Sequence, residues 1–335
     1  MFGSHLSIAG GMHNTLLAAE TLGMETVQVF TKNQQQWVAR DLEPEQVAEF
    51  RRQSRRLGFA KIVAHDSYLI NLAAEGAGLR EKSVAAFVEE VRRCDLLGIR
   101  YLVMHPGAHT GQGEEVGIKK VIEAFGRIID EVEEWEREGG KGRRLLPGVK
   151  AEEWRPVTVC IESTAGQGTC LGHTFEHLAE ILAGVKRSER FGICLDTCHL
   201  LAAGYELETA EGTQKMLTEF DRLIGMKHLK VWHLNDSKKP RGSRVDRHEH
   251  IGRGCVGLAA FGVICRDPRF AQIPKILETP KEKAPDGREW DEINLAILRD
   301  LAAGKKVKIE TMAEKAAVTE ADAKKPPRRQ GTKSK

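Results

Sequence analysis

The run YLVMH, residues 101–105, is short and apolar and ends on an imidazole, that of His105. Five more runs of this kind occur in the chain, and each closes on a side chain that can bind a metal ion. Their length and β-branched content are typical of buried parallel strands. The closing side chains would then share the carboxyl-terminal edge of one sheet, where α/β enzymes build their active sites. The five other runs are KIVAH ending at His65, TVCIE at Glu162, GICLD at Asp196, LKVWH at His233 and KILE at Glu278.

Two earlier runs raise the number of expected strands to eight: GSHLSI at residues 3–8 and TVQVF at residues 26–30. Helix-like stretches separate the runs, among them Asn14–Leu22, Pro44–Leu57 and Arg80–Leu97. Eight parallel strands with helices between them indicate an α/β protein of the (β/α)8 TIM-barrel type. A doubly wound open sheet is the alternative architecture. It gathers its ligands near one switch point, however, whereas here they come from six strands.

Composition agrees with this fold class. The chain has 335 residues, 41% hydrophobic and 30% charged, which is enough for one barrel of about 250 residues plus appendages. It has no run of about 18 apolar residues, so we expect no membrane span. The first expected strand begins next to Met1, so we expect no signal peptide. Seven cysteines, an odd number without CxxC spacing, suit a reducing compartment.

The charge of the chain is unevenly placed. Residues 304–335 carry 10 Lys and Arg against 4 Asp and Glu, so the first 303 residues hold 41 against 44. With its KKVK and KKPPRR clusters, this segment is expected to be a disordered basic tail behind one barrel domain, residues 1–303. It fits a solvated tail, a contact with nucleic acid, or a signal for a nuclear import receptor. We favour the import signal, and therefore a nuclear, intracellular protein that is not secreted.

A second irregular stretch, REGGKGRRLLPGVKAEEWRP at residues 137–156, lies between the fourth expected helix and the fifth strand. Such a junction faces the amino-terminal end of a barrel, away from the strand ends that carry the site. We expect this basic insert to be an appendage or a partner contact, on a protein that is a monomer.

Three more candidate ligands join the six strand ends: His199 in DTCH, and the pair Asp246 and His248 in VDRH. Nine His, Asp and Glu side chains are too many for one tetrahedral zinc ion, which takes about three or four protein ligands. Two or three metal ions are therefore expected. Five imidazoles among the nine favour zinc over magnesium or calcium, while manganese or iron at one position stays open.

Neighbouring divalent ions need a carboxylate between them to offset their repulsion, and such a pair can hold a hydroxide. Glu162, central in the strand order, is the natural bridge. Cys198, between Asp196 and His199, is either a soft zinc ligand or a small packing residue, and we favour packing.

Several long and unusual motifs run through the chain: GSHLSIAGG, FTKNQQQW, HDSYLINL, HPGAH, IESTAGQGT, GICLDTCHLLAAGY, HLNDSK, GSRVDRHEHIGRG and ILETP. Together they resemble the endonuclease IV family, or AP endonuclease family 2. These are the zinc-dependent apurinic/apyrimidinic (AP) endonucleases of DNA base-excision repair. The resemblance extends over about residues 3–302. It implies a (β/α)8 barrel, in agreement with the strand count.

The resemblance also implies a chemistry. Glu162 would be catalytic, because it bridges two zinc ions that hold the attacking hydroxide between them. The implied reaction hydrolyses the phosphodiester 5′ to an abasic site in double-stranded DNA and leaves a 3′ hydroxyl and a 5′ deoxyribose phosphate. Trimming of blocked 3′ ends is implied as a second activity. The resemblance distributes the ligands among three zinc ions: His65, His105 and Glu162; Glu162, Asp196, His233 and Glu278; and His199, Asp246 and His248.

Recognition of a missing base needs the lesion sugar flipped out of the duplex. In the family, loops after the second and third strands insert side chains into the gap, and here these loops carry Asn33, Gln35, Tyr68 and Leu69. Well-known members often have a basic residue at the position of Gln35. A neutral amide forgoes phosphate attraction and guanidinium stacking, so we expect weaker lesion affinity. Phosphate contacts are expected from Lys32, Lys238, Arg244 and Arg247, in stretches next to strand ends.

Two other functions compete with this interpretation. A xylose-isomerase-like sugar isomerase or epimerase shares the barrel and a carboxylate-rich metal site, but it does not explain the DRH triplet or the aromatic residues of the loops. A zinc-stabilised DNA-binding scaffold without turnover is the non-enzymatic alternative. We favour the endonuclease.

Overall fold

The computed structural model describes residues 1–140 and 154–309. Its main sheet has eight strands, all paired in parallel, in the order β1-β10-β7-β6-β5-β4-β3-β2. Each predicted apolar run overlaps one of them, and β1 and β6 begin one residue before their runs. The strands are β1 (Phe2–Ser4), β2 (Gln28–Phe30), β3 (Val63–His65), β4 (Tyr101–Met104), β5 (Thr158–Glu162), β6 (Phe191–Asp196), β7 (Leu229–His233) and β10 (Lys275–Leu277).

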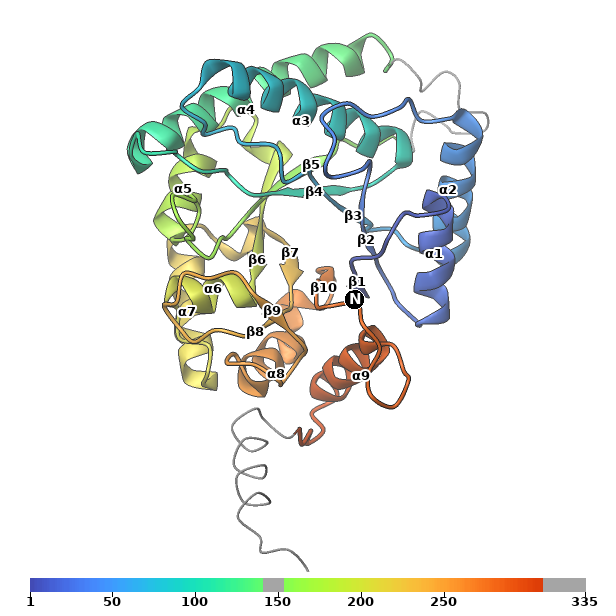
Figure 1. Ribbon diagram of the computed structural model, residues 1–335, viewed down its shortest axis with the longest axis vertical. Helices are drawn as coiled ribbons and strands as arrows, with labels where there is room; N and C mark the ends of the chain where they lie inside the picture. The colour runs from blue at the N-terminus through green and yellow to red at the C-terminus, as the bar shows by residue number, and fades with distance from the viewer. Residues whose placement is uncertain (141–153, 310–335) are drawn as a thin grey trace, which may run out of the picture.

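The sheet closes on itself. Directly after β1, His5 forms a parallel bridge with Gln28 of β2, and the Leu6 N–H donates to the Gln28 carbonyl over 2.9 Å. In Figure 1 the helices form an outer ring around the strands. The fold is therefore the predicted (β/α)8 barrel and not an open, doubly wound sheet.

The helices begin and end close to the predicted residues. Pro44, whose missing N–H costs nothing in a first turn, starts α2, and Gly58, in the left-handed region at φ 69, ends it. The helices α1 and α3 begin two and three residues earlier than predicted. The reason is that no capping side chain marks their first turns. The helices are α1 (Met12–Thr21), α2 (Pro44–Leu57), α3 (Ala77–Leu97), α4 (Glu114–Arg137), α5 (Phe175–Gly184), α6 (Thr197–Ala203), α7 (Ala210–Leu223), α8 (Leu258–Arg266) and α9 (Trp290–Ala302), with short 3₁₀ turns η3 (Ser188–Arg190), η4 (Met226–His228) and η5 (Pro268–Phe270).

The barrel interior holds a small apolar cluster that is separate from the large core between strands and helices. Each of its members lies two residues before a strand-end candidate ligand. Residues two apart point to the same side of a strand, so the ligands form the next layer on the inward face. The ligands therefore stand on a dry floor at the carboxyl end of the barrel. The floor residues are Val63, Val103, Cys160, Cys194, Val231 and Ile276.

The segment between β7 and α8 leaves the barrel and carries two of the candidate ligands. It contains a short antiparallel pair, β8 (Asp236–Ser237) with β9 (His248–Glu249). Asp236, fully buried, accepts backbone hydrogen bonds from Ser237, Gly252 and Val256 over 2.8–2.9 Å. These bonds fix both ends of the segment against each other.

The packed part of the chain extends beyond the predicted boundary at residue 303. Val307 packs against the core, and the Ile309 side chain lies beside Gly252. Most of the predicted basic tail, residues 310–335, lies outside the described residues, as do residues 141–153 of the basic insert. Within residues 1–140 and 154–309, no helix is long and apolar enough to cross a membrane.

Candidate metal centre

Glu162 lies at the centre of the strand-end cluster and is fully buried. One of its oxygens, Oε2, lies 3.1 Å from His65 Nε2 and 3.1 Å from His105 Nε2. The other, Oε1, lies 2.8 Å from His233 Nδ1. The two carboxylate oxygens therefore face two separate groups of imidazoles, as a bridging ligand would.

A second group surrounds His233. Its Nδ1 atom lies 3.1 Å from Glu278 Oε2 and 3.9 Å from Asp196 Oδ2. The strands β5, β6 and β7 and the residue after β10 supply these side chains, so the closed sheet itself sets their spacing.

A third group forms around Asp246. Its Oδ2 atom lies 3.2 Å from His199 Nε2, and its Oδ1 atom lies 3.2 Å from His248 Nε2. His199 sits in the first turn of α6, and its backbone N–H donates to Asp196 Oδ1, the N-cap of that helix. Asp196 Oδ2 is 3.8 Å from His248 Nε2, so Asp196 stands between the second and third groups. All nine predicted ligands are thus brought together.

The donor atoms fit metal ions. Zinc binds nitrogen and oxygen at about 2.0–2.1 Å, which places the atoms of a tetrahedral shell about 3.4 Å apart. The closest pairs here are 2.8–3.2 Å apart, near that spacing. His248 Nε2 is buried, and although Asp246 Oδ1 lies 3.2 Å away, this nitrogen makes no well-directed hydrogen bond among the described residues, as expected of an atom that binds a metal ion. Overlapping sets of imidazole and carboxylate groups therefore form a site suited to several metal ions.

The outward-facing nitrogen of four of these imidazoles has a fixed partner. Such partners set the tautomer and ring orientation of metal-binding histidines. They were not predicted from the sequence, although Gln28, a polar residue inside an apolar run, was a visible signal. The contacts are His65 Nδ1 to Asp66 O at 3.0 Å, His199 Nδ1 to Ser163 O at 2.8 Å, His233 Nε2 to Gln28 Oε1 at 2.8 Å and His248 Nδ1 to Glu278 O at 3.1 Å.

Without metal, the cluster is a set of ion pairs. Burial alone would raise the pKa of Glu162, but His233 and His105 hold it well below its ordinary value. Burial also opposes a proton on His248, yet Asp196 and Asp246 raise its pKa to about 9. Metal ions binding to this cluster must therefore displace protons from imidazoles.

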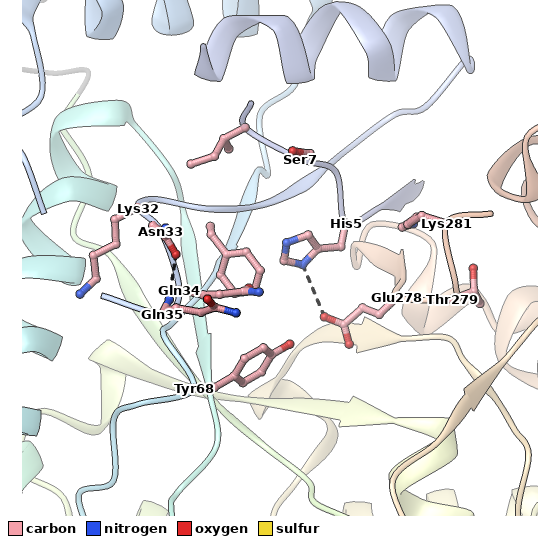
Figure 2. Close-up of a pocket in the computed structure, with 12 residues that line it drawn as sticks. His5, Ser7, Lys32, Asn33, Gln34, Gln35, Tyr68, Glu278, Thr279 and Lys281 are labelled. Atoms are coloured by element: carbon pink, nitrogen blue, oxygen red, sulfur yellow. Dashed lines mark hydrogen bonds and ion pairs between the residues drawn. The ribbon is translucent and has the colours of Figure 1, made fainter. Parts of the chain in front are cut away.

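Lys32 follows the end of β2 and is buried. Its side chain is 3% exposed and its ammonium lies 3.6 Å from Glu90 Oε1. It donates to the carbonyls of Gln36 and Trp37 over 3.2 and 3.1 Å, and it is one of the residues that line the cavity drawn in Figure 2. These contacts hold the loop after β2 in shape, and the role of Lys32 as a phosphate contact stays a prediction.

The two predicted recognition loops lie side by side at the barrel mouth. Ser67 Oγ donates to the Gln34 carbonyl over 2.6 Å and joins them. Asn33 and Gln35 are exposed, Leu69 is half-buried, and Tyr68 is 63% exposed. These loops border a cavity of about 590 Å³ that Figure 2 shows in close-up. Tyr68 and Glu278 line both this cavity and the one beside the third ligand group, so the two adjoin.

The remaining predicted phosphate contacts lie on the β7–α8 segment. Lys238, Arg244 and Arg247 are exposed. Arg247 also lines the cavity that holds His105, His199 and Asp246. Arg247 therefore stands near the candidate metal centre.

Cys198 lies next to the third group. It is fully buried, and burial raises the pKa of its thiol to about 12. Its sulfur lies within 4.8 Å of ligand atoms of Asp246 and His248. In the metal-free protein it is an uncharged packing residue at neutral pH.

Sequence comparison places this architecture among known proteins. The family described as "Xylose isomerase-like TIM barrel" matches residues 16–301. "Probable endonuclease 4" of Chloroflexus aurantiacus is 48% identical over 303 residues, which cover 90% of this chain and 98% of that protein. The protein of the same name from Geobacter sulfurreducens is 48% identical over 309 residues, which cover 92% and 97%.

Comparison with solved structures agrees with the sequence comparison. The crystal structure of endonuclease IV from Thermus thermophilus matches with a TM-score of 0.73 and 35% identity, covering 90% of this chain and 99% of that one. A D-psicose 3-epimerase matches with a TM-score of 0.61 at 14% identity, over 90% and 99% of the two chains, and shares the fold alone. This chain belongs to the endonuclease IV family of xylose isomerase-like TIM barrels.

Proposed function

We propose that this protein is a zinc-dependent AP endonuclease of DNA base-excision repair. It hydrolyses the phosphodiester 5′ to an abasic site and leaves a 3′ hydroxyl and a 5′ deoxyribose phosphate. The observation that carries the proposal is Glu162, whose two oxygens face separate imidazole groups 2.8–3.1 Å away at the mouth of an endonuclease IV barrel. Trimming of blocked 3′ ends belongs to the same proposal, because it is also phosphoester hydrolysis.

The residues around the metal centre have distinct roles in this reaction. When bound, zinc ions supply an activated water and Lewis acidity for the phosphate oxygens. Glu162 would hold two of the cations and offset their repulsion. Asp196 would do the same between the second and third groups, from which its Oδ2 atom is 3.9 and 3.8 Å distant. The apolar floor beneath closes the site to water from inside the barrel.

Residues at the rim of the barrel mouth bind the substrate. Exposed Lys238, Arg244 and Arg247 attract the phosphate backbone, with an affinity that depends on salt. Tyr68 and Gln35 stand on neighbouring loops beside the cavity, where they can occupy the gap left by a missing base. The third ligand group, with Asp246 and His248 next to Arg247, favours a polyanionic substrate over a free sugar.

An incision assay with mapped products tests the proposal. We expect a duplex with one abasic site to be cut once, with an end that a DNA polymerase can extend, and a 3′-phosphate at a nick to be removed. Intact duplex and chelator-treated protein are the controls. A metal-supplied protein that leaves abasic DNA uncut, or that cuts it on the 3′ side, contradicts the proposal. Interconversion of D-fructose and D-psicose without incision would favour the epimerase alternative.

A further inference from the structure

We propose that His5 is a substrate-contacting hydrogen-bond donor of this site, which binds an acceptor oxygen of the lesion nucleotide through Nε2–H. The inference rests on the proposed function and adds a residue that is not among the nine ligands. Its basis is the position of the His5 ring and the hydrogen-bond network that places its proton.

His5 lies at the junction of the metal centre and the cavity between the loops. It follows β1 directly, and its ring packs on Phe30 with centroids 4.3 Å apart. Figure 2 shows the ring inside the cavity, turned toward Glu278. The His5 Nε2 atom is buried and finds no hydrogen-bond partner within the described part of the chain. A buried polar atom that lacks a partner, on a residue that lines a cavity, is suited to a ligand.

The proton on His5 is placed by a network that starts at the metal centre. His233 presents Nδ1 to the carboxylates of Glu162 and Glu278, at 2.8 and 3.1 Å. These carboxylates raise the pKa of His233 against burial, so the metal-free ring carries a proton on both nitrogens, and a metal ion bound at Nδ1 would leave the proton on Nε2. That nitrogen donates to Gln28 Oε1 over 2.8 Å. The orientation of the Gln28 amide follows, because its oxygen is occupied by this bond.

The amide nitrogen of Gln28 then faces His5. It lies 2.6 Å from Glu278 Oε1 and 2.9 Å from His5 Nδ1. An amide nitrogen only donates, so His5 Nδ1 must accept and the proton of the neutral ring is on Nε2. Glu278 Oε1 is 3.6 Å from His5 Nδ1, beyond hydrogen-bond distance. With a metal ion on His233 Nδ1, this network would leave His5 as a donor through Nε2.

The occupant that this donor fits is rich in acceptor oxygens. The exposed Asn33 and Gln35 amides line the same cavity as His5. The cavity adjoins the ligand groups through Glu278 and Tyr68. A nucleotide whose phosphate lies at the metal centre would place its sugar or a flanking phosphate in this space. Both offer acceptor oxygens, and the choice between them is experimental.

Two substitutions separate the donor from the ring. His5→Phe keeps the contact with Phe30 and removes the donor, whereas His5→Gln keeps an N–H near the position of Nε2. We expect His5→Phe to retain its zinc content and to lose about 10-fold or more in affinity for a duplex with a tetrahydrofuran abasic analogue. His5→Gln should recover most of that loss. A parallel measurement on a nicked duplex with a 3′-phosphate distinguishes the oxygens, since only a phosphate contact weakens both substrates.

These experiments distinguish failure of the His5 proposal from failure of the proposed function. If His5→Phe binds and cuts like the parent, or if both variants lose zinc together, His5 is not a substrate donor. Nitrogen-15 NMR of histidine in the zinc-loaded parent gives a readout without a variant, and a proton on Nδ1 of His5 overturns the proposal. Absence of incision by the parent itself would instead refute the proposed function.

Discussion

Glu162 is the residue with the most connections in the site. Its side chain is fully buried, and four imidazoles, those of His65, His105, His199 and His233, lie within 3.4 Å of its oxygens. Such a concentration of donors around one carboxylate is costly without cations to bind, because each charged group has been removed from water. The arrangement is therefore best explained as a shared ligand.

Replacing Glu162 by Gln keeps the shape and removes the charge. We expect less than the full zinc content, a fall in single-turnover incision of about 100-fold or more, and partial retention of DNA binding. Glu176→Gln, on the exposed first turn of α5, is the matched control and should change none of these. Normal turnover by the Glu162 variant would remove the residue from its proposed role.

The protonation of His248 gives a second expectation. Its pKa is raised from 6.5 to about 9 in the metal-free fold. The charged form therefore stabilises that fold fully below about pH 6.5, and the stabilisation is lost as the pH rises through about 9. The same proton competes with a metal, so zinc binding should release protons at neutral pH and tighten between about pH 6 and about pH 8.

Calorimetry in buffers of different ionisation enthalpy counts the released protons. His248→Asn should release fewer than the parent. A binding enthalpy that is the same in every buffer, with an affinity independent of pH, would contradict the expectation.

At the scale of elements, the strand ends could be predicted because two simple patterns coincide. An apolar run with a polar last residue marks both a buried strand and its functional end. The residues that orient the ligands could not be found this way. Ser163 and Asp66 contribute backbone carbonyls, which any residue offers. The buried ion pair of Lys32 was missed for a related reason: Glu90, its partner, belongs to α3, and sequence spacing does not reveal that contact.

The β7–α8 segment depends on one carboxylate. Asp236 accepts from three backbone N–H groups and thereby positions the excursion that carries Asp246 and His248. Asp236→Ala should lower the free energy of unfolding by about 2–4 kcal/mol, because buried donors lose their acceptor. The variant should also lose the metal ion of the third ligand group more readily than the other two.

Zinc analysis and chemical denaturation of the Asp236 variant check this expectation. Asp221→Ala is the control: exposed Asp221 accepts from the Met226 N–H over 2.7 Å, far from any ligand. The control should lose at most about 1 kcal/mol and no zinc. Full zinc content in Asp236→Ala would show that the segment is held by other contacts.

At the scale of the whole molecule, the barrel is complete without the basic residues 310–335. The last residues that pack against the barrel lie beyond the predicted boundary at residue 303. Deleting residues 310–335 should leave the melting temperature and low-salt incision unchanged. Deleting 304–335 also removes the packing of Val307 and Ile309 and should lower the melting temperature by about 2 °C or more. Equal stabilities of the two truncated proteins would contradict this boundary.

Nuclear location stays a prediction, because most of the basic segment on which it rests, residues 310–335, lies outside the described residues, and the comparisons do not support it. A fluorescent fusion in a eukaryotic cell tests it. Loss of nuclear accumulation on deleting residues 304–335 is the expected result, and accumulation by the truncated fusion refutes the import interpretation.

The central claim is that incision of abasic DNA requires the metal ions held by the strand ends and the β7–α8 segment. Stepwise addition of zinc to the metal-free protein, with single-turnover incision followed at each step, tests it most directly. We expect no cutting before zinc is added and a rate that rises until about three equivalents are bound, as the three ligand groups require. Incision by the metal-free protein, or a rate that is already maximal at one equivalent, would contradict the account.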